Sequence, residues 1–181
     1  MEDARTCGNQ LAQAKTIADF DKHWRAWLRA IQRIWHKLED AGRSHAQFQA
    51  IKSAHRALER TDELIRYIKQ ARDVDEHSVR DVAGATSRTT IRPVNQSAGI
   101  YVQRMEIRNG QLVTYQGTPI HVEQLLTMVL LPVVNRGVVY APPQKHLGEI
   151  IENSPLRVIE LAMAYYGSLV DRADRECVER R

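Results

Sequence analysis

Hydrophobic positions divide the chain into a helical first part, a β-rich middle and a helical last part. Over residues 19–40 the apolar side chains recur every three or four positions, which predicts one long amphipathic helix. Its hydrophobic stripe consists of Trp24, Trp27, Leu28, Ile31, Ile34, Trp35 and Leu38. Either Asp19 or Asp21 is a candidate cap for its first turn, and Gly42 is expected to end it.

Three further helices are predicted by the same criteria. Residues 44–60 predict a helix of thin apolar content, and residues 61–76 predict a third, with Thr61 as its N-cap. A last helix is expected at the end of the chain, with Ser154 as its N-cap and Pro155 in its first turn. These helices can pack in antiparallel order, as in a four-helix bundle.

The middle of the chain predicts antiparallel β structure. Residues 100–108 and 112–116 flank Asn109-Gly110, the dipeptide that most strongly favours a two-residue hairpin turn. The preceding residues, 81–99, show neither the helical nor the strand periodicity of hydrophobic positions and predict a loose linker.

A second hairpin is expected from residues 125–134 and 138–141, with its turn at 135–137. Pro132 would place the first of these strands at an edge or a bulge. Residues 125–131 also fit a helix, and periodicity alone leaves both alternatives open.

The predicted fold is therefore mainly α (α+β), a bundle of four helices with a small antiparallel β-hairpin insertion before the last helix. Residues 1–17 are expected to be a flexible N-terminus. Residues 18–80 form the first part of the bundle, residues 81–150 the linker and β insertion, and residues 151–178 the closing helix.

Composition narrows the class of protein. The chain has 181 residues, of which 43% are hydrophobic and 27% charged, as expected for one globular domain. Only Cys7 and Cys177 are present, which excludes a disulfide scaffold and a CxxC metal or redox site. The acidic start, Met1-Glu2-Asp3, does not resemble a signal peptide, and no apolar run is long enough to span a bilayer. We expect a soluble, cytoplasmic protein that does not bind membranes.

No motif for a cofactor is present, since GxGxxG, P-loop, GxSxG and HExxH patterns are all missing. Asp73, Asp75, Glu76 and His77 are close in sequence, but neighbouring helical positions point in different directions. They are therefore not expected to share a metal ion, and neither a metal nor a cofactor is predicted.

The third predicted helix contains an arginine in an unusual place. Arg72 follows Ile68 by four residues and therefore lies on the hydrophobic stripe, where an arginine needs a partner. Asp75 and Glu76 are within helical reach of it. A purely structural interpretation is an Arg72–carboxylate pair followed by an exposed His77 at the helix end.

The segment Arg72-Asp73-Val74-Asp75-Glu76-His77 resembles the R-x4-6-H motif of the HEPN-domain family, with the polar residue that this family often places after the arginine. Residues 62–72 resemble the motif helix of an uncharacterised bacterial branch of that family. The resemblance covers residues 18–80 and extends to 154–178, whereas residues 88–145 form an insertion whose role it leaves open.

The resemblance implies a four-helix bundle and a metal-independent endoribonuclease that acts as a homodimer, in some members as a toxin or defence protein with an antitoxin partner. Arg72 would then hold the scissile phosphate, His77 would act as general acid or base, and Asp73 would orient one of them. Many HEPN domains lack activity. The alternative function is a non-catalytic module for dimerisation or for binding RNA or protein.

A line of basic residues on the first long helix favours RNA as a partner. Lys22, Arg25, Arg29, Arg33 and Lys37 follow one another at helical spacing, opposite the hydrophobic stripe. Such a line could bind phosphates independently of sequence. The alternative interpretation is an ordinary solvated helix face, and the net charge of +4 permits either.

Overall fold

The computed structural model describes residues 1–77, 83–95, 99–108, 111–151 and 154–177. In these residues the fold is mixed α+β, with five helices that make it 58% helical and with small antiparallel strand pairs. The chain divides into two compact units. Unit 1 comprises Met1–Gly84 and Val129–Arg181, and unit 2 comprises Ala85–Met128.

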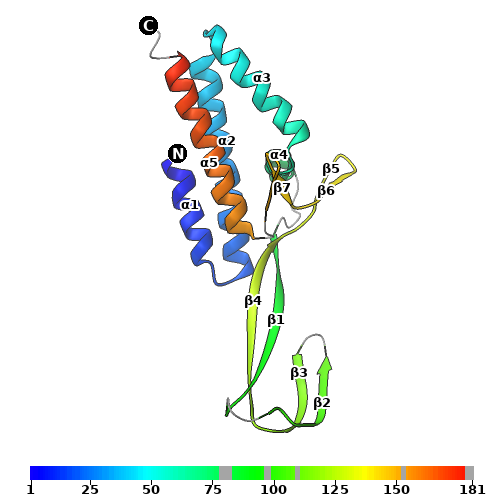
Figure 1. Cartoon of the computed structure of the whole chain (residues 1–181). Helices are drawn as coiled ribbons and strands as arrows, with labels where there is room; N and C mark the ends of the chain where they lie inside the picture. Colours follow the sequence, from blue (N-terminus) through cyan, green and yellow to red (C-terminus); the bar gives the residue numbers. More distant parts are fainter. Residues whose placement is uncertain (78–82, 96–98, 109–110, 152–153, 178–181) are drawn as a thin grey trace. The chain divides into compact units, whose positions relative to one another are not determined.

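Unit 1 contains all five of the described helices. They are α1 (Glu2–Gln13), α2 (Ile17–Gly42), α3 (Ala46–Thr61), α4 (Glu63–His77) and α5 (Pro155–Cys177). In Figure 1, α1, α2 and α5 lie alongside one another, and α4, which packs against α2, α3 and α5, is seen almost end-on. The helices α2 and α5 point in the same direction, so the simple antiparallel order expected from the sequence is not found.

The amino terminus differs from the prediction. The expected flexible segment forms α1, which packs against α2 and α5 and buries Ala4 and Leu11. Sequence reasoning missed this helix because its apolar content is low. Its small residues allow close packing, as at Gly8, where an added Cβ would lie 3.3 Å from the Ile159 side chain.

The boundaries of the predicted helices are largely as expected, but two caps differ. The α2 cap is Thr16, whose hydroxyl accepts a hydrogen bond of 3.1 Å from the Asp19 N–H. The predicted cap Thr61 belongs to α3, whereas Asp62 accepts a 3.0 Å hydrogen bond from the Ile65 N–H in the first turn of α4. The last helix begins at Pro155, as predicted.

The hydrophobic core of unit 1 is built around α2. The expected core tryptophans are fully or nearly buried, and the rings of Trp24 and Trp27 stack with their centroids 5.1 Å apart. The core also contains the buried stripe of α4, which consists of Leu64, Ile65, Tyr67, Ile68, Ala71 and Val74. This burial fixes α4 between α2, α3 and α5, and α4 carries the candidate motif.

Two short hairpins complete unit 1 and pack against α4. The strands β5 (Val133–Asn135) and β6 (Val138–Tyr140) form a hairpin where the second one was predicted, but its first strand is β5 alone and not residues 125–134. The strand β7 (Lys145–His146) pairs with β8 (Glu149–Ile150). The Tyr67 hydroxyl donates a 2.7 Å hydrogen bond to the Leu131 carbonyl just before β5.

Unit 2 contains two strand pairs. The strand β1 (Ala83–Pro93) pairs with β4 (Ile120–Leu130), and β2 (Val102–Arg108) pairs antiparallel with β3 (Gln111–Gly117). The first predicted hairpin is thus confirmed, while its Asn109-Gly110 turn lies outside the described residues.

One expectation for this part of the chain is corrected, because the expected linker, residues 81–99, contains β1. Of the two alternatives for residues 125–131, the strand is found and not the helix, since residues 125–130 belong to β4, although β4 pairs with β1 and not with residues 138–141. The physical reason is that β1 and β4 stabilise each other across a long stretch of chain. A polar strand such as β1 shows no alternation by which its sequence could be recognised.

None of the described helices is both long enough and apolar enough to cross a membrane.

The last residue of α2 provides a test of core packing. A Cβ added at Gly42 would overlap the ring of Phe48, which is only 1% exposed. We expect Gly42→Ala to lower the free energy of unfolding by about 1–2 kcal/mol in urea denaturation, because the ring cannot move away. The control is Gly99→Ala, where an added Cβ has no neighbour within 4 Å. Equal stability of the two variants would contradict the packing shown here.

Candidate functional site

The candidate motif lies in the last turns of α4. The Arg72 side chain, 20% exposed, binds Oδ1 of its neighbour Asp73 through Nη2 at 2.6 Å and through Nε at 3.1 Å. Two donors of one guanidinium therefore meet one carboxylate oxygen, which fixes the plane of the arginine. His77 is the last residue of α4, and its side chain lies outside what the structure describes.

Asp75 does not bind Arg72, contrary to the structural interpretation of the motif. Its side chain, only 1% exposed, accepts hydrogen bonds from two arginines of α2, at 2.7 Å from Arg25 Nη1 and 3.1 Å from Arg29 Nε. Arg25 also binds Asp21 at 2.6 Å. A carboxylate buried to this degree needs such partners, so this cluster holds the end of α4 against α2.

The basic line of α2 is only partly free. Arg25 and Arg29 are paired with Asp75, and Arg33 lies 3.4 Å from Asp3 of α1. Lys22 and Lys37 are exposed, and no ion pair of either is found among the described residues. Asp75 and Asp3 come from other helices, so the spacing on α2 alone could not reveal them, whereas Asp21 lies on α2 itself, four residues before Arg25.

A second polar cluster, which sequence reasoning missed, lies in the core beside Arg72. His55 of α3 is 1% exposed, and its Nδ1 lies 2.8 Å from the Tyr165 hydroxyl of α5. Glu59 receives a hydrogen bond of 2.9 Å from Lys69 of α4, and its other oxygen lies 3.7 Å from His55 Nε2. The available sequence signal was the spacing of His55 and Glu59, four residues apart on one helix.

The charge state of His55 follows from this environment. Burial, helped by the positive charges of Lys69 and Arg72, lowers the pKa of His55 to about 4 against the opposing effect of Glu59. At neutral pH the ring is therefore uncharged, and it lies against Trp35 with centroids 4.0 Å apart and planes tilted by 36°. Burial likewise raises the pKa of the Tyr165 and Tyr166 hydroxyls, so both are neutral.

A third cluster joins the beginning of α4 to the β7–β8 hairpin. Asp62 Oδ1 lies 3.0 Å from His146 Nδ1, and Asp62 Oδ2 accepts a 2.7 Å hydrogen bond from the Leu147 N–H. Burial acts to raise the pKa of Asp62, but these hydrogen bonds and that from Ile65 outweigh it and leave the pKa lowered. Because a carboxylate only accepts, Nδ1 of the buried His146 carries the proton.

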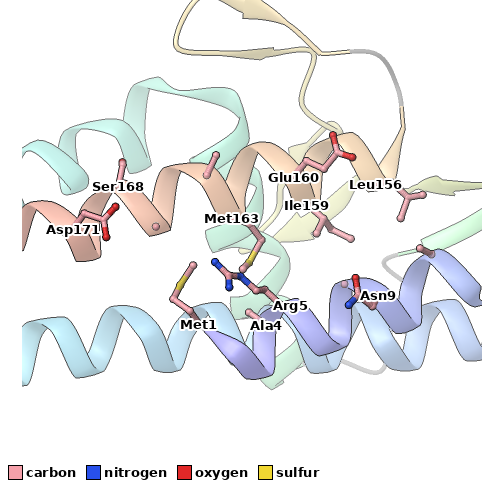
Figure 2. A pocket seen from close by; sticks show the side chains of 14 residues that line it. Met1, Ala4, Arg5, Asn9, Leu156, Ile159, Glu160, Met163, Ser168 and Asp171 are labelled. Atoms are coloured by element: carbon pink, nitrogen blue, oxygen red, sulfur yellow. The ribbon is translucent and has the colours of Figure 1, made fainter.

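Two of the cavities in unit 1 are the most spacious of those found there, and both lie away from the motif. The larger, about 640 Å³, is a groove between α1 and α5 (Figure 2) and is lined mainly by small and apolar side chains such as Ala4 and Met163. The other, about 450 Å³, lies beside α4 and contains Arg66 and Tyr140. Neither contains a residue of the predicted site.

In the described part of the chain, no group of three or more His, Cys, Asp or Glu side chains could hold a metal ion. Comparison with known proteins gives no relative: no family model, no curated protein and no solved structure matches the chain.

The Asp75 cluster predicts a large effect of one substitution. We expect Asp75→Ala to lower the free energy of unfolding by roughly 3 kcal/mol, because it removes the buried carboxylate that binds both Arg25 and Arg29 and holds α4 against α2. The control is Asp40→Ala, which removes an exposed pair with Arg43 and should cost less than about 1 kcal/mol. A similar small loss in both variants, measured by urea denaturation, would contradict a structural role for Asp75.

His55 predicts a pH dependence of stability. Its pKa is lower in the folded protein, about 4, than the ordinary 6.5, so the unfolded chain takes up the proton first as the pH falls. Stability should therefore be complete above pH 6.5 and fall by about 3 kcal/mol as the pH approaches 4. We expect His55→Gln to reduce this slope in denaturation series at several pH values. His121→Gln, which changes an exposed side chain, should retain the slope.

Proposed function

We propose that the chain is a HEPN-like, metal-independent endoribonuclease that acts as a homodimer, with Arg72, Asp73 and His77 as its catalytic site. One observation carries the proposal. Arg72 is held by Asp73 alone among the described carboxylates, and Asp75 is taken by α2. An arginine oriented in this way, with its Nη1 hydrogens unbound in the described part of the chain, is suited to binding a phosphate.

The acidic residues of the motif are a weaker obstacle to RNA binding than their number suggests. The charges of Asp21 and Asp75 are balanced by those of Arg25 and Arg29, so this cluster is neutral as a whole. It therefore adds no net repulsion against a polyanion near the end of α4.

In the proposed reaction the 2′-hydroxyl of the substrate attacks the adjacent phosphorus. The new bond joins the 2′-oxygen to phosphorus, and the bond from phosphorus to the 5′-oxygen breaks, which leaves a 2′,3′-cyclic phosphate and a free 5′-hydroxyl. Arg72 binds the phosphate oxygens as negative charge develops, and Asp73 keeps the guanidinium in place. His77 of one chain takes the 2′-hydroxyl proton, and the second copy at the shared cleft supplies a proton to the 5′-oxygen.

A non-catalytic module that binds RNA or protein is the second candidate. It is favoured by the environment of Arg72, whose side chain is mostly buried and whose charge acts on the core residues His55 and Tyr166. In that case Arg72 stabilises the core and contributes nothing to a reaction.

Cleavage of a structured RNA separates the two candidates. We expect the wild-type chain to cleave it in the presence of EDTA, and His77→Ala to lower the rate roughly 10²- to 10⁴-fold, because the proton-transfer group is lost. Arg72→Lys keeps the charge but loses the fixed fork of donors and should also be slow.

Two matched controls accompany these variants. Arg66→Ala changes an arginine of the same helix outside the motif, and His121→Gln changes an exposed histidine. Both should retain cleavage. Cleavage that survives His77→Ala, or that is missing in the wild-type chain as a dimer, would overturn the proposal.

A further inference from the structure

The described side chains of unit 2 form no hydrophobic core of their own. Not one of its residues with a described side chain is buried, whereas unit 1 contains every buried side chain found in the structure. Eight large apolar residues of unit 2 are exposed, namely Val94, Ile100, Tyr101, Val102, Met105, Ile107, Val113 and Val122. Two-stranded antiparallel pairs are marginally stable in water unless another surface covers one face.

The β2–β3 ribbon has one apolar and one polar face. Residues directly opposite each other in an antiparallel pair point to the same face. The pairs on one face are Val102 with Gly117, Met105 with Tyr115, and Ile107 with Leu112. The other face contains the pairs Arg104 with Gln116 and Glu106 with Thr114. We call the first set the apolar ribbon face.

Two irregularities in the strand register create this separation. The register shifts between Val102 and Arg104, which skips Gln103, and between Glu106 and Ile107, which skips Val113. With strict alternation, Val102 would lie on the polar face beside Arg104. Leu112 would likewise lie on the polar face, beside Thr114. Each shift returns an apolar side chain to the apolar face, as a β-bulge does when it redirects a strand.

The base of the ribbon is held in one conformation. The Tyr101 carbonyl accepts hydrogen bonds from the Thr118 N–H at 2.9 Å and from the Tyr115 hydroxyl at 3.2 Å. Gly117, with φ of 155°, approaches the Tyr101 carbonyl so closely that an added Cβ would overlap it. The apolar ribbon face is thus a defined surface and not a random exposure of single side chains.

We propose that the apolar ribbon face binds the same face of a second copy of this chain. It contains no charged side chain, so pairing about a two-fold axis places no like charges opposite each other. Arg104 and Glu106 lie on the opposite face, and Glu106 binds Arg108 there at 2.6 Å. A polyanion such as RNA would be attracted to that arginine-bearing face and not to the uncharged one.

This inference rests on the proposed function in one respect, because a composite ribonuclease site requires two copies of the chain. Sheets pack face to face at about 10 Å, and a standard interface takes roughly 800 Å² from each partner. The apolar ribbon face offers five side chains besides Gly117, which places this contact below the standard size. We therefore expect a dimer that dissociates on dilution.

The test is the molar mass of the full-length chain in light scattering at several concentrations. We expect a dimer at high concentration, and a shift of the dissociation constant by at least 100-fold in Ile107→Lys, which places a charge in the centre of the face. The matched control is Thr114→Lys, which adds the same charge to the polar face of the same ribbon and should leave the dimer intact. Circular dichroism verifies that both variants keep the helices of unit 1.

A measurement on the unmodified chain complements the variants. Amide hydrogen exchange over residues 102–117 should slow only at concentrations at which the dimer forms. A chain that stays monomeric, a dimer unaffected by Ile107→Lys, or equal dissociation in Thr114→Lys would each overturn the inference. So would ribbon protection that appears only when RNA is added, which would assign the surface to RNA.

The two proposals fail in different ways. A His77→Ala chain that is dimeric but inactive, together with a monomeric Ile107→Lys chain, supports both. If Ile107→Lys leaves the dimer intact and the wild-type chain cleaves RNA, only the proposed ribbon interface is ruled out. If Ile107→Lys dissociates the dimer and the wild-type chain does not cleave RNA, only the proposed ribonuclease activity is ruled out.

Discussion

The carboxylate of Asp62 fixes the position of the helix that carries the motif. It accepts hydrogen bonds from the Ile65 N–H, the Leu147 N–H and His146 Nδ1, and it lies where α3 ends and α4 begins. One buried side chain therefore sets the direction change between two helices and attaches the β7–β8 hairpin to α4. Glu63, its neighbour, strengthens the attachment by accepting hydrogen bonds from the Gln144 and Lys145 N–H groups.

The opposite end of α4 is held by charge instead of by capping. Asp75 draws Arg25 and Arg29 toward α4, and this arrangement leaves Arg72 to Asp73. The cluster has two consequences for function. First, Asp75 binds the arginines of α2 and not Arg72, so Arg72 is oriented by its neighbour Asp73. Second, Arg25 and Arg29 are paired with Asp75 and are therefore less available to bind a polyanion.

The two units differ in what stabilises them. Unit 1 buries aromatic and aliphatic side chains from five helices, and its buried side chains His55, Asp62 and His146 have hydrogen-bond partners. Two indole N–H groups, of Trp24 and Trp27, are buried without an acceptor among the described residues, which is a cost that the stacked rings offset. Unit 2 has backbone pairing, but none of its described side chains is buried, so its apolar ribbon face lacks a covering surface among the described residues.

The sequence alone determined the elements whose signal is local. The period of the α2 stripe, the Ser154-Pro155 start of α5 and the alternation around Asn109-Gly110 each depend on neighbouring residues, and the corresponding elements are found. The position of Arg72 on a hydrophobic stripe was equally visible. Its pairing with Asp73 was open, because the helix offered several carboxylates at similar spacing.

Only the tertiary structure decided what depends on residues far apart in the chain. It replaced the expected flexible N-terminus by α1, since small side chains there pack closely on α5, and it turned the expected linker into β1 through pairing with β4. It assigned Asp75 to arginines some fifty positions away and Asp62 to His146 across the β insertion. Such contacts leave no period in the sequence, because they depend on which surfaces the folded chain brings together.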